Sequence, residues 1–462
     1  MNIKTALLLF VIGVFTFGAK LSAQKLWTLE ECINYAYENN IDIQQSVLSV
    51  NSADHDLLQS KYNLAPSLNA SASHSFGWGR SFDQSANRYA SKNTQQSYFS
   101  INSQVTLFNG LQLINNVRQK QFDYLSQKYA SDKIRNDMSL NIAASYLLIL
   151  FNIELVNNAQ RQVDISQEQI ERTKKQVDAG AVSRGSLYDI EAQGAADEAS
   201  LVSAKNKVML AYLDLMQLLD MESNNDFDIV KPSFDIVGIP SLLPAEMIYN
   251  KSVLIMPEIK SAEYRVESAQ RGLSIAKGLR SPRLYASSSY GTNFSDQLMK
   301  SYIPGQPGYN DMISFGEQFT ENRNGTLSLG LSIPIFNGYQ VSTSIKKSQI
   351  YYESVSLSLE SEKLRLRKNI EKAYADAVGS YQTFISRQKS VDAFTESFKF
   401  TEEKFNIGMV NSTDYNLVKI QLANAEANLA SSKFDYIFKT KILDFYLGRS
   451  MSLSDIANVN EK

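Results

Sequence analysis

The chain makes the same abrupt change of pattern twice. It reads VTLFNGLQL at 105–113 and SIPIFNGYQ at 332–340, and each time a run of alternating polar and apolar residues stops at Phe-Asn-Gly. A stretch of 69 residues follows: 111–179 has no Gly or Pro, and 339–407 has only Gly379. At about 1.5 Å per residue, each stretch would form a helix of roughly 100 Å. The sequence therefore predicts two strand-to-helix switches, each followed by an unusually long helix.

The similarity between the two halves extends well beyond these three letters. At a spacing of 228 residues the matched pairs include Tyr124 and Tyr352, Tyr146 and Tyr374, Gly180 and Gly408, Gln193 and Gln421, and Lys205 and Lys433. Upstream of Phe-Asn-Gly the spacing becomes 216, and it pairs Ile43 with Ile259, Val50 with Val266, Pro66 with Pro282, and Leu68 with Leu284. Fixed spacings over such lengths predict an internal two-fold repeat.

Each repeat is predicted to contain the same elements in the same order. Repeat 1 spans 24–222, with a helix, strands 67–78 and 97–108, a long helix 110–178 and a return helix 186–221. Repeat 2 spans 246–450, with a helix, strands 283–294 and 325–336, a long helix 338–406 and a return helix 413–448. Segments 79–96 and 295–324 are predicted to be solvent-exposed loops. A linker, 223–245, has room for one short strand and would form a belt at the middle, and a tail covers 451–462.

The predicted strands have one apolar and one small, polar face. In 67–78 the apolar face carries Leu68, Ala70, Ala72, His74, Phe76 and Trp78, whereas Ser, Asn and Gly fill the other face. Strands of this length and pattern, with aromatic residues near their ends, are typical of a membrane barrel with a wet lumen. A soluble β-sandwich hairpin would alternate in the same way. Four strands cannot close a membrane barrel, so we expect three chains to pool twelve strands.

The N-terminus has the features of a signal peptide over residues 1–23. Lys4 precedes the apolar run at 6–19, and Ala23 suits a cleavage site. The longest later apolar run, 146–156, is interrupted by Asn152 and Glu154 and is too short to span a bilayer as a helix. An exported membrane protein of this kind is therefore expected to span the membrane as a β-barrel.

Composition argues against several function classes. The formal net charge is −2, which disfavours a nucleic-acid partner. Two His and one Cys leave little material for a metal site or a nucleophile. Only the triplet Asp54-His55-Asp56 suggests a secreted acid–base enzyme, and its counterpart at 270–272, Gln-Arg-Gly, lacks such groups. We expect no enzymatic activity and no cofactor, and energy for any transport would have to come from a partner.

The long helices are predicted to end at two turns, DAGAVSRGS (178–186) and NIGMVNSTD (406–414). Gly180 and Gly408 have the character of the C′ glycines that end helices. Ser183 or Ser186 would cap the first return helix, and Ser412 or Asp414 the second. Apolar residues at heptad spacing, such as Val163, Ile170 and Val177, favour an antiparallel coiled coil between the long and return helices.

These features, together with WTLEECINYAYENNIDI at 27–43, resemble the TolC-like outer-membrane efflux duct family, the outer membrane factors. The resemblance implies a mixed α/β membrane protein. It would be a homotrimer with a 12-stranded β-barrel in outer-membrane lipid, continued by a periplasmic α-helical coiled-coil barrel. A periplasmic adaptor and an inner-membrane pump would be its partners, and the tripartite system would export small molecules or toxic compounds. A duct for type I protein secretion and a soluble coiled-coil adaptor or structural protein remain the alternatives.

The resemblance also implies two sets of site residues. The family closes its periplasmic aperture with helix-borne residues, often aspartates, just after the turn glycine. Asp414 is the sixth residue after Gly408, while Ser186 and Asp189 are the sixth and ninth after Gly180. The second set comprises candidates for adaptor docking at the turns: Gly180, Ala181, Val182, Gly408, Met409 and Val410. A capping role for Asp414 and ordinary turn packing for the second set are the alternatives.

Overall fold

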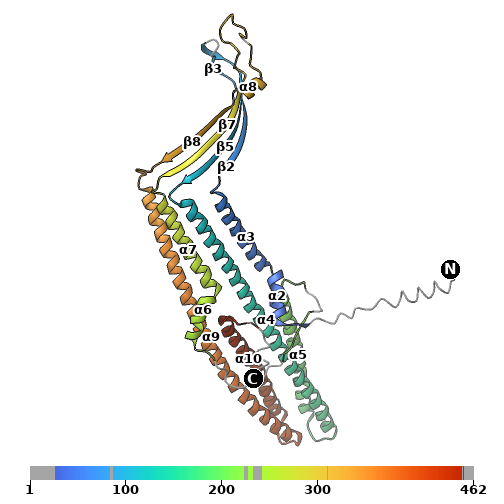
Figure 1. The fold of residues 1–462 in the computed structure, drawn as a ribbon. Helices are drawn as coiled ribbons and strands as arrows, with labels where there is room; N and C mark the ends of the chain where they lie inside the picture. The colour runs from blue at the N-terminus through green and yellow to red at the C-terminus, as the bar shows by residue number, and fades with distance from the viewer. Residues whose placement is uncertain are drawn as a thin grey trace, which may run out of the picture. The chain divides into compact units, whose positions relative to one another are not determined.

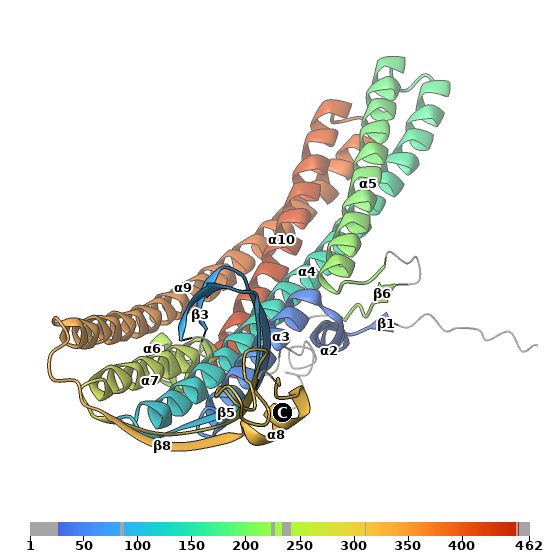
Figure 2. The same cartoon turned by 90° about the horizontal axis from the view of Figure 1, so that it is seen from above.

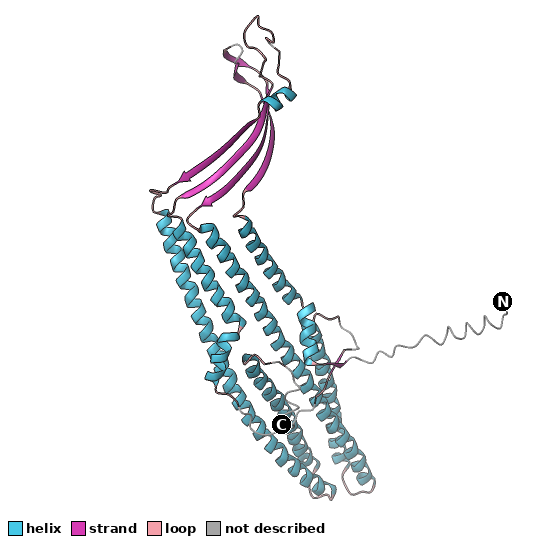
Figure 3. Ribbon diagram, in the orientation of Figure 1, coloured by secondary structure: helices cyan, strands magenta, loops and turns pink. Residues whose placement is uncertain are grey.

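A computed structural model describes residues 26–83, 87–222, 227–232, 242–309, 311–449 and 451. The expected signal peptide, most of the linker and all of the tail except Met451 lie outside these residues. The fold is mainly helical with one four-stranded sheet (Figures 1 and 3). Two compact units are present: one holds Met1–Val47, Ser131–Pro257 and Lys363–Lys462, and the other, the sheet unit, holds Leu48–Ala130 and Glu258–Glu362.

The sheet unit contains four antiparallel strands side by side (Figure 1). They are β2 (Ser67–Gly77), β5 (Thr94–Phe108), β7 (Arg283–Ser295) and β8 (Asn324–Ser332), in the order β2-β5-β7-β8. β8 ends four residues before the expected end at 336, which corrects the sequence prediction. Pro334 explains the early end, because proline has no N–H to donate to a strand ladder.

Both segments expected to be loops contain regular structure, so that expectation was wrong in part. In the first, β3 (Arg80–Asp83) and β4 (Arg88–Ser91) form a hairpin. In the second, helix α8 (Phe315–Glu321) begins with a capping box between Ser314 and Glu317. The capping box satisfies two backbone N–H groups at the helix start, which stabilises so short a helix. The Phe319 ring of α8 packs edge-on against Phe99 of β5, with 5.5 Å between ring centroids.

Four helices adjoin these strands along the chain: α3 (Ile41–Tyr62), α7 (Pro257–Gly278) and the two long helices α4 (Gln112–Asp178) and α9 (Gln340–Asn406). At both Phe-Asn-Gly junctions the chain passes from strand to helix through two consecutive residues with positive φ. These are Gly110 and Leu111 at 66° and 61°, and Gly338 and Tyr339 at 57° and 66°. Glycine adopts this conformation without the cost that Leu111 and Tyr339 bear, so glycine is favoured as the first of the two residues at each junction.

In the other unit, each long helix lies beside a return helix, α4 beside α5 (Arg184–Leu218) and α9 beside α10 (Ser412–Tyr446) (Figures 1 and 2). The return helices have 35 residues each and the long helices 67 each. The unit also holds α2 (Leu29–Asn39) and α6 (Ala245–Ile255). A short strand β1 (Leu26–Trp27) pairs in parallel with β6 (Asp228–Ile229), which lies in the predicted linker.

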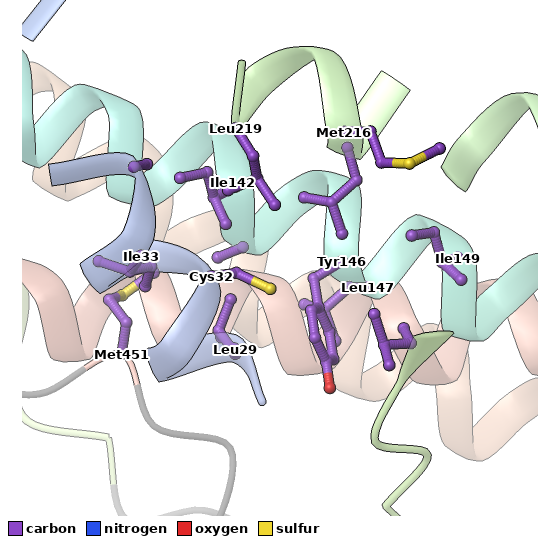
Figure 4. Packing of buried hydrophobic residues seen from close by; sticks show 14 of the residues in the cluster. Leu29, Cys32, Ile33, Ile142, Tyr146, Leu147, Ile149, Met216, Leu219 and Met451 are labelled. Atoms are coloured by element: carbon purple, nitrogen blue, oxygen red, sulfur yellow. The ribbon is translucent and has the colours of Figure 1, made fainter. Parts of the chain in front are cut away.

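The main core of this unit is formed where α2 packs against α4 and α5 (Figure 4). Tyr146 and Ile142 of α4, Cys32 of α2 and Leu219 after α5 are at most 1% exposed. The Tyr146 hydroxyl lies 2.7 Å from the carbonyl oxygen of Val230 and 3.1 Å from that of Trp27. One tyrosine therefore fixes both the N-terminal segment and the linker strand to the long helix.

Candidate functional site

The first candidate site is the polar face of the sheet. It forms an open recess of ≈ 330 Å³, lined by Ser67, Asn69, Asn102, Ser103, Gln104, Ser287, Ser288, Ser289, Thr326 and Ser328. Across this face the hydroxyl oxygens of Ser71 and Ser100 are 2.8 Å apart. Hydroxyls and amides both donate and accept hydrogen bonds, and they carry no charge. The surface is therefore suited to contact with a column of water.

The opposite face of the sheet is apolar and exposed in the single chain. On β8 the side chains of Leu327, Leu329 and Leu331 are 80%, 73% and 63% exposed. They alternate with Thr326, Ser328 and Gly330, as the sequence pattern predicted. Contiguous apolar surface of this kind is unfavourable in water and marks a contact with lipid or protein.

One described helix, α4, has a stretch that length and composition would allow to cross a membrane. Half of that stretch is buried inside the protein. Tyr146, Leu147, Ile149 and Leu150 belong to the core cluster described above. The apolar character of this part of α4 is explained by packing against its own chain.

The second candidate site is the pair of turns that join the long and return helices. Gly180 and Gly408 have φ of 72° and 78°. The next N–H groups, of Ala181 and Met409, donate to carbonyl oxygens five residues back, at 2.8 Å and 2.9 Å. This is the hydrogen-bond pattern of a Schellman motif, and it confirms both residues as helix-ending C′ glycines.

The return helices are capped in equivalent ways. Ser183 caps α5, since its side chain accepts a hydrogen bond from the Ser186 N–H. Asn411 caps α10: its Oδ1 accepts from the Asp414 N–H at 2.8 Å, and its Nδ2 donates to Asp414 Oδ2 at 3.0 Å. The prediction of Ser412 or Asp414 as the cap was therefore wrong. Asparagine is among the best cap residues, and its extended backbone here starts the helix one residue earlier.

One of the three aperture candidates, Asp189, connects the two helical hairpins. Asp189 of α5 accepts a hydrogen bond from the Ser412 hydroxyl at the start of α10, at 3.0 Å. Ser186 and Asp414 occupy equivalent positions, three residues after their caps. Among the described residues, no hydrogen bond or ion pair joins Asp414 to Ser186 or Asp189. Asp414 is exposed to solvent.

The docking candidates lie at the surface of the turns. Met409 is 70% exposed, and Gly180, Ala181 and Gly408 are also exposed. Val182 and Val410 are half-buried. The turns therefore present small and apolar groups to solvent.

A buried charge cluster near these turns was missed by the sequence analysis. Lys419 of α10 is 2% exposed, and its Nζ donates to Asp197 Oδ2 of α5 at 2.6 Å and to the Gln162 carbonyl oxygen of α4 at 3.1 Å. The Ser166 hydroxyl contacts both charged groups. Three helices are thus joined by one ammonium group. The cluster has no local sequence signal, because its two charges are 222 residues apart.

An aromatic stack lies beside the turns and joins the same hairpins. Tyr415 is 1% exposed and stacks on Phe405, with 4.7 Å between ring centroids, and both pack against Ile190. Burial raises the pKa of the Tyr415 hydroxyl above its usual value. The side chain therefore stays neutral at any physiological pH, so the stack does not respond to pH.

A second polar cluster holds the linker strand. The Tyr212 hydroxyl donates to Asp228 Oδ1 at 2.5 Å, and Lys231 Nζ donates to Asp228 Oδ2 at 3.1 Å. Burial alone would raise the pKa of Asp228, but these hydrogen bonds outweigh it and hold that pKa below its usual value.

Among the described residues no group of three or more His, Cys, Asp or Glu side chains could hold a metal ion.

Comparison with known proteins gives a consistent family match. The model of the family described as outer membrane efflux protein matches residues 32–220 and 249–449. The sequence is 22% identical over 463 residues to the outer membrane protein TolC of Vibrio cholerae, covering 99% of this chain and 98% of that protein. It is 20% identical over 426 residues to the toxin and drug export protein A of Aggregatibacter actinomycetemcomitans, covering 88% of this chain and 83% of that protein.

The fold is also similar to solved channel structures. Crystal structures of CusC, a protein that forms a transmembrane channel, superpose with a TM-score of 0.76 at 16% sequence identity. The match covers 92% of each chain. Since the identity is low, this similarity establishes the fold alone.

Proposed function

This chain belongs to the outer membrane efflux protein family, and we propose that three copies of it assemble into one duct. The protein resides in the outer membrane and acts there as an efflux channel. In the proposed trimer, the four strands of each copy contribute to a 12-stranded barrel. The long and return helices of the three copies form an α-helical coiled-coil barrel in the periplasm, and the two halves of each chain are repeats of one plan.

The two-faced sheet with unpaired edges is the observation that carries this proposal. Among the described residues, β2 pairs only with β5 and β8 only with β7. In lipid an unpaired edge costs several kcal/mol per unsatisfied backbone group, so the edges must be paired by other copies. Leu329 and Ser328 then face lipid and water, respectively, as their alternation along β8 requires.

A matched pair of substitutions tests this arrangement. Leu329→Arg should abolish insertion or lower the stability of the trimer by about 2–4 kcal/mol, because it places a charge on the lipid face. Ser328→Arg should leave the trimer intact and lower the conductance for cations in planar lipid bilayers. Equal tolerance of both substitutions, or a wild-type protein that stays monomeric and passes no ions, would contradict the proposal.

The partners and cargo follow from the same family plan. A periplasmic adaptor docks on the exposed turns around Met409 and Ala181, and an inner-membrane pump supplies the energy. Small or toxic molecules are the cargo, which the relative named as a toxin and drug export protein supports. Photocross-linking from Val410 in whole cells should capture the adaptor, and loss of the gene should sensitise cells to toxic compounds. A cargo limited to a secreted protein would contradict this part.

Asp414, with Asp189 and Ser186, lines the periplasmic aperture in this proposal. A ring of three Asp414 carboxylates narrows the mouth and attracts cations to it. Asp414→Ala should widen the closed tip or make it leak, and so raise the single-channel conductance of the closed channel, while Glu191→Gln, on an exposed part of α5, should leave that conductance unchanged. An unchanged conductance in Asp414→Ala would leave its hydrogen bond with the cap residue Asn411 as its only role.

A further inference from the structure

The two hairpins of the sheet have the same strand register once the repeat spacings are applied. In the first, Ser67 of β2 pairs with Gln104 of β5. Moving Ser67 forward by 216 residues gives Arg283, and moving Gln104 forward by 228 gives Ser332. Arg283 of β7 pairs with Ser332 of β8. The two spacings that relate the sequences of the repeats therefore also relate the strand pairing within their hairpins.

The two hairpins are joined to each other where β5 pairs with β7, and we call this contact between the two repeats of one chain the internal seam. Ser100 of β5 pairs there with Gly291 of β7. Along the adjoining helices α4 and α7, Tyr264 stacks between Phe122 and Tyr129, at ring-centroid distances of 6.1 Å and 5.6 Å. This seam is where the second strand and long helix of repeat 1 meet the first helix and strand of repeat 2.

We infer that the seam between neighbouring copies repeats this internal seam residue by residue. Applying the same spacings to Ser100 and Gly291 places Ser328 of β8 opposite Ser75 of the partner subunit. Leu329 then lies opposite His74 of the partner subunit, so the apolar faces of both strands coincide. The inference rests on the proposed trimer and specifies its interface.

The same transformation predicts the helix contact. Phe122 and Tyr129 become Ile350 and Leu357 on α9, and Tyr264 becomes Leu48 on α3 of the partner subunit. In the single chain Ile350, Leu357 and Leu48 are 66%, 71% and 65% exposed. Each position that the transformation brings together is thus a large apolar side chain without cover. Ile350 and Leu357 are seven residues apart and share one face of α9, where Leu48 can insert between them.

A second copy of this chain is therefore the occupant that fits both surfaces. Where the internal seam has stacked aromatic rings, the seam between copies has aliphatic side chains at the equivalent positions. The free edge of β8 continues along the chain into α9, just as β5 continues into α4 at the internal seam. A lipid could cover Leu357 but could not satisfy the backbone groups of the β8 edge.

Engineered cysteines test the register. Ser328→Cys combined with Ser75→Cys should give covalent dimers and trimers under mild oxidation. Ser328→Cys combined with Ser71→Cys is the matched control, because a shift of four residues moves the partner by about 13 Å, beyond disulfide reach. Each single substitution controls for Cys32, which is the chain's own cysteine and is fully buried.

Charge substitutions test the helix contact. Leu48→Glu should lower the temperature at which the trimer dissociates in detergent, and adding Leu357→Lys should restore part of the loss. Leu58→Glu, on the same helix, is the control. Its counterpart Ser274 hydrogen-bonds within its own helix, so Leu58→Glu should have little effect on dissociation.

The outcomes separate this inference from the proposed function. Cross-linking in the 328–75 pair, with rescue of Leu48→Glu by Leu357→Lys, supports the inferred seam. A conducting trimer that cross-links through the 328–71 pair instead, or a double charge variant no more stable than Leu48→Glu alone, overturns the seam and leaves the duct standing. A protein that forms no trimer overturns both.

Discussion

The two Phe-Asn-Gly junctions share three residues and the same left-handed backbone, yet their surroundings differ. A Cβ added to Gly110 would lie 2.5 Å from the Gly278 carbonyl oxygen, whereas at Gly338 no atom of the described residues, apart from the glycine and its two chain neighbours, lies within 4 Å of the same position. Residues of repeat 2 cover the junction at Gly110. In a single chain the junction at Gly338 is uncovered. The shared Phe-Asn-Gly residues therefore determine the local turn, while the place of each junction in the fold determines which residues pack on it.

The largest expected difference between the repeats concerns the charge cluster. Lys419→Met would leave the Asp197 carboxylate, whose side chain is 13% exposed, without its ion-pair partner, at a cost of up to about 3–5 kcal/mol. Glu191, the counterpart of Lys419 in repeat 1, is exposed, and Glu191→Gln should cost less than about 0.5 kcal/mol. The dissociation temperature of the purified trimer compares the two. Similar shifts would show that burial of the ammonium group has no energetic consequence.

Alanine substitutions at three glycines rank next. Gly180→Ala carries only the cost of a left-handed backbone, about 1–2 kcal/mol, because nothing lies near its Cβ position. Gly110→Ala adds a backbone clash of about 1–3 kcal/mol to the same cost. The yield and dissociation temperature of the trimer should fall more for Gly110→Ala than for Gly180→Ala. If both fell equally, the close approach of Gly278 would be irrelevant to stability.

Gly338→Ala sharpens this comparison. An isolated chain leaves room for the extra methyl group, so the effect would match that of Gly180→Ala. The inferred seam between copies places the end of the partner's α3 there, so the effect should approach that of Gly110→Ala. Trimer dissociation by heat, measured for all three variants in parallel, distinguishes an open junction from a covered one.

A smaller effect is expected for a matched pair of tyrosines. Tyr146 is 1% exposed and its hydroxyl reaches two carbonyl oxygens, while Tyr374, its counterpart at a spacing of 228, is partly exposed. Tyr146→Phe should cost about 1–3 kcal/mol, because it removes the hydroxyl that donates to the partly buried Val230 carbonyl oxygen. Tyr374→Phe should be close to neutral. Thermal denaturation followed by circular dichroism provides the measurement, and equal shifts would contradict the assigned role of the hydroxyl.

The smallest expected effect is a pH dependence from Asp228. Its pKa is lower in the folded protein than in the unfolded chain, so it adds stability at neutral pH that declines below about pH 4 as the carboxylate is protonated. Asp228→Asn should remove this contribution and flatten the decline in melting temperature between about pH 5 and pH 3. A variant with an unchanged pH profile would argue against the Tyr212 and Lys231 contacts as its source.

Local signals predicted the parts of the fold that depend on local geometry. Gly180 and Gly408 ended helices as expected, because a left-handed C′ position demands glycine. Helix α8 was missed although Ser314 and Glu317 have the spacing of a capping box, because the surrounding Gly, Asn and Asp residues obscured it. The apolar face of β8 was predictable from alternation alone.

Contacts between distant segments could not be predicted in the same way. Lys419 on a helix surface is usually solvated, and only the folded chain reveals that Asp197 and Ser166 enclose it. The cap at Asn411 was missed for a simpler reason: four good cap residues follow one another at 411–414, and the sequence does not say which one adopts the extended backbone. Such choices depend on the packing of the whole hairpin.

The internal seam between β5 and β7 has a consequence for subunit count. Each copy offers one edge and accepts another, a head-to-tail joint that forms either a closed ring or an endless fibre. In the inferred seam, the bend at each joint between copies equals the bend between β5 and β7 within one chain. With that geometry, the curvature at the β5–β7 pairing of one chain determines the number of subunits in the closed ring.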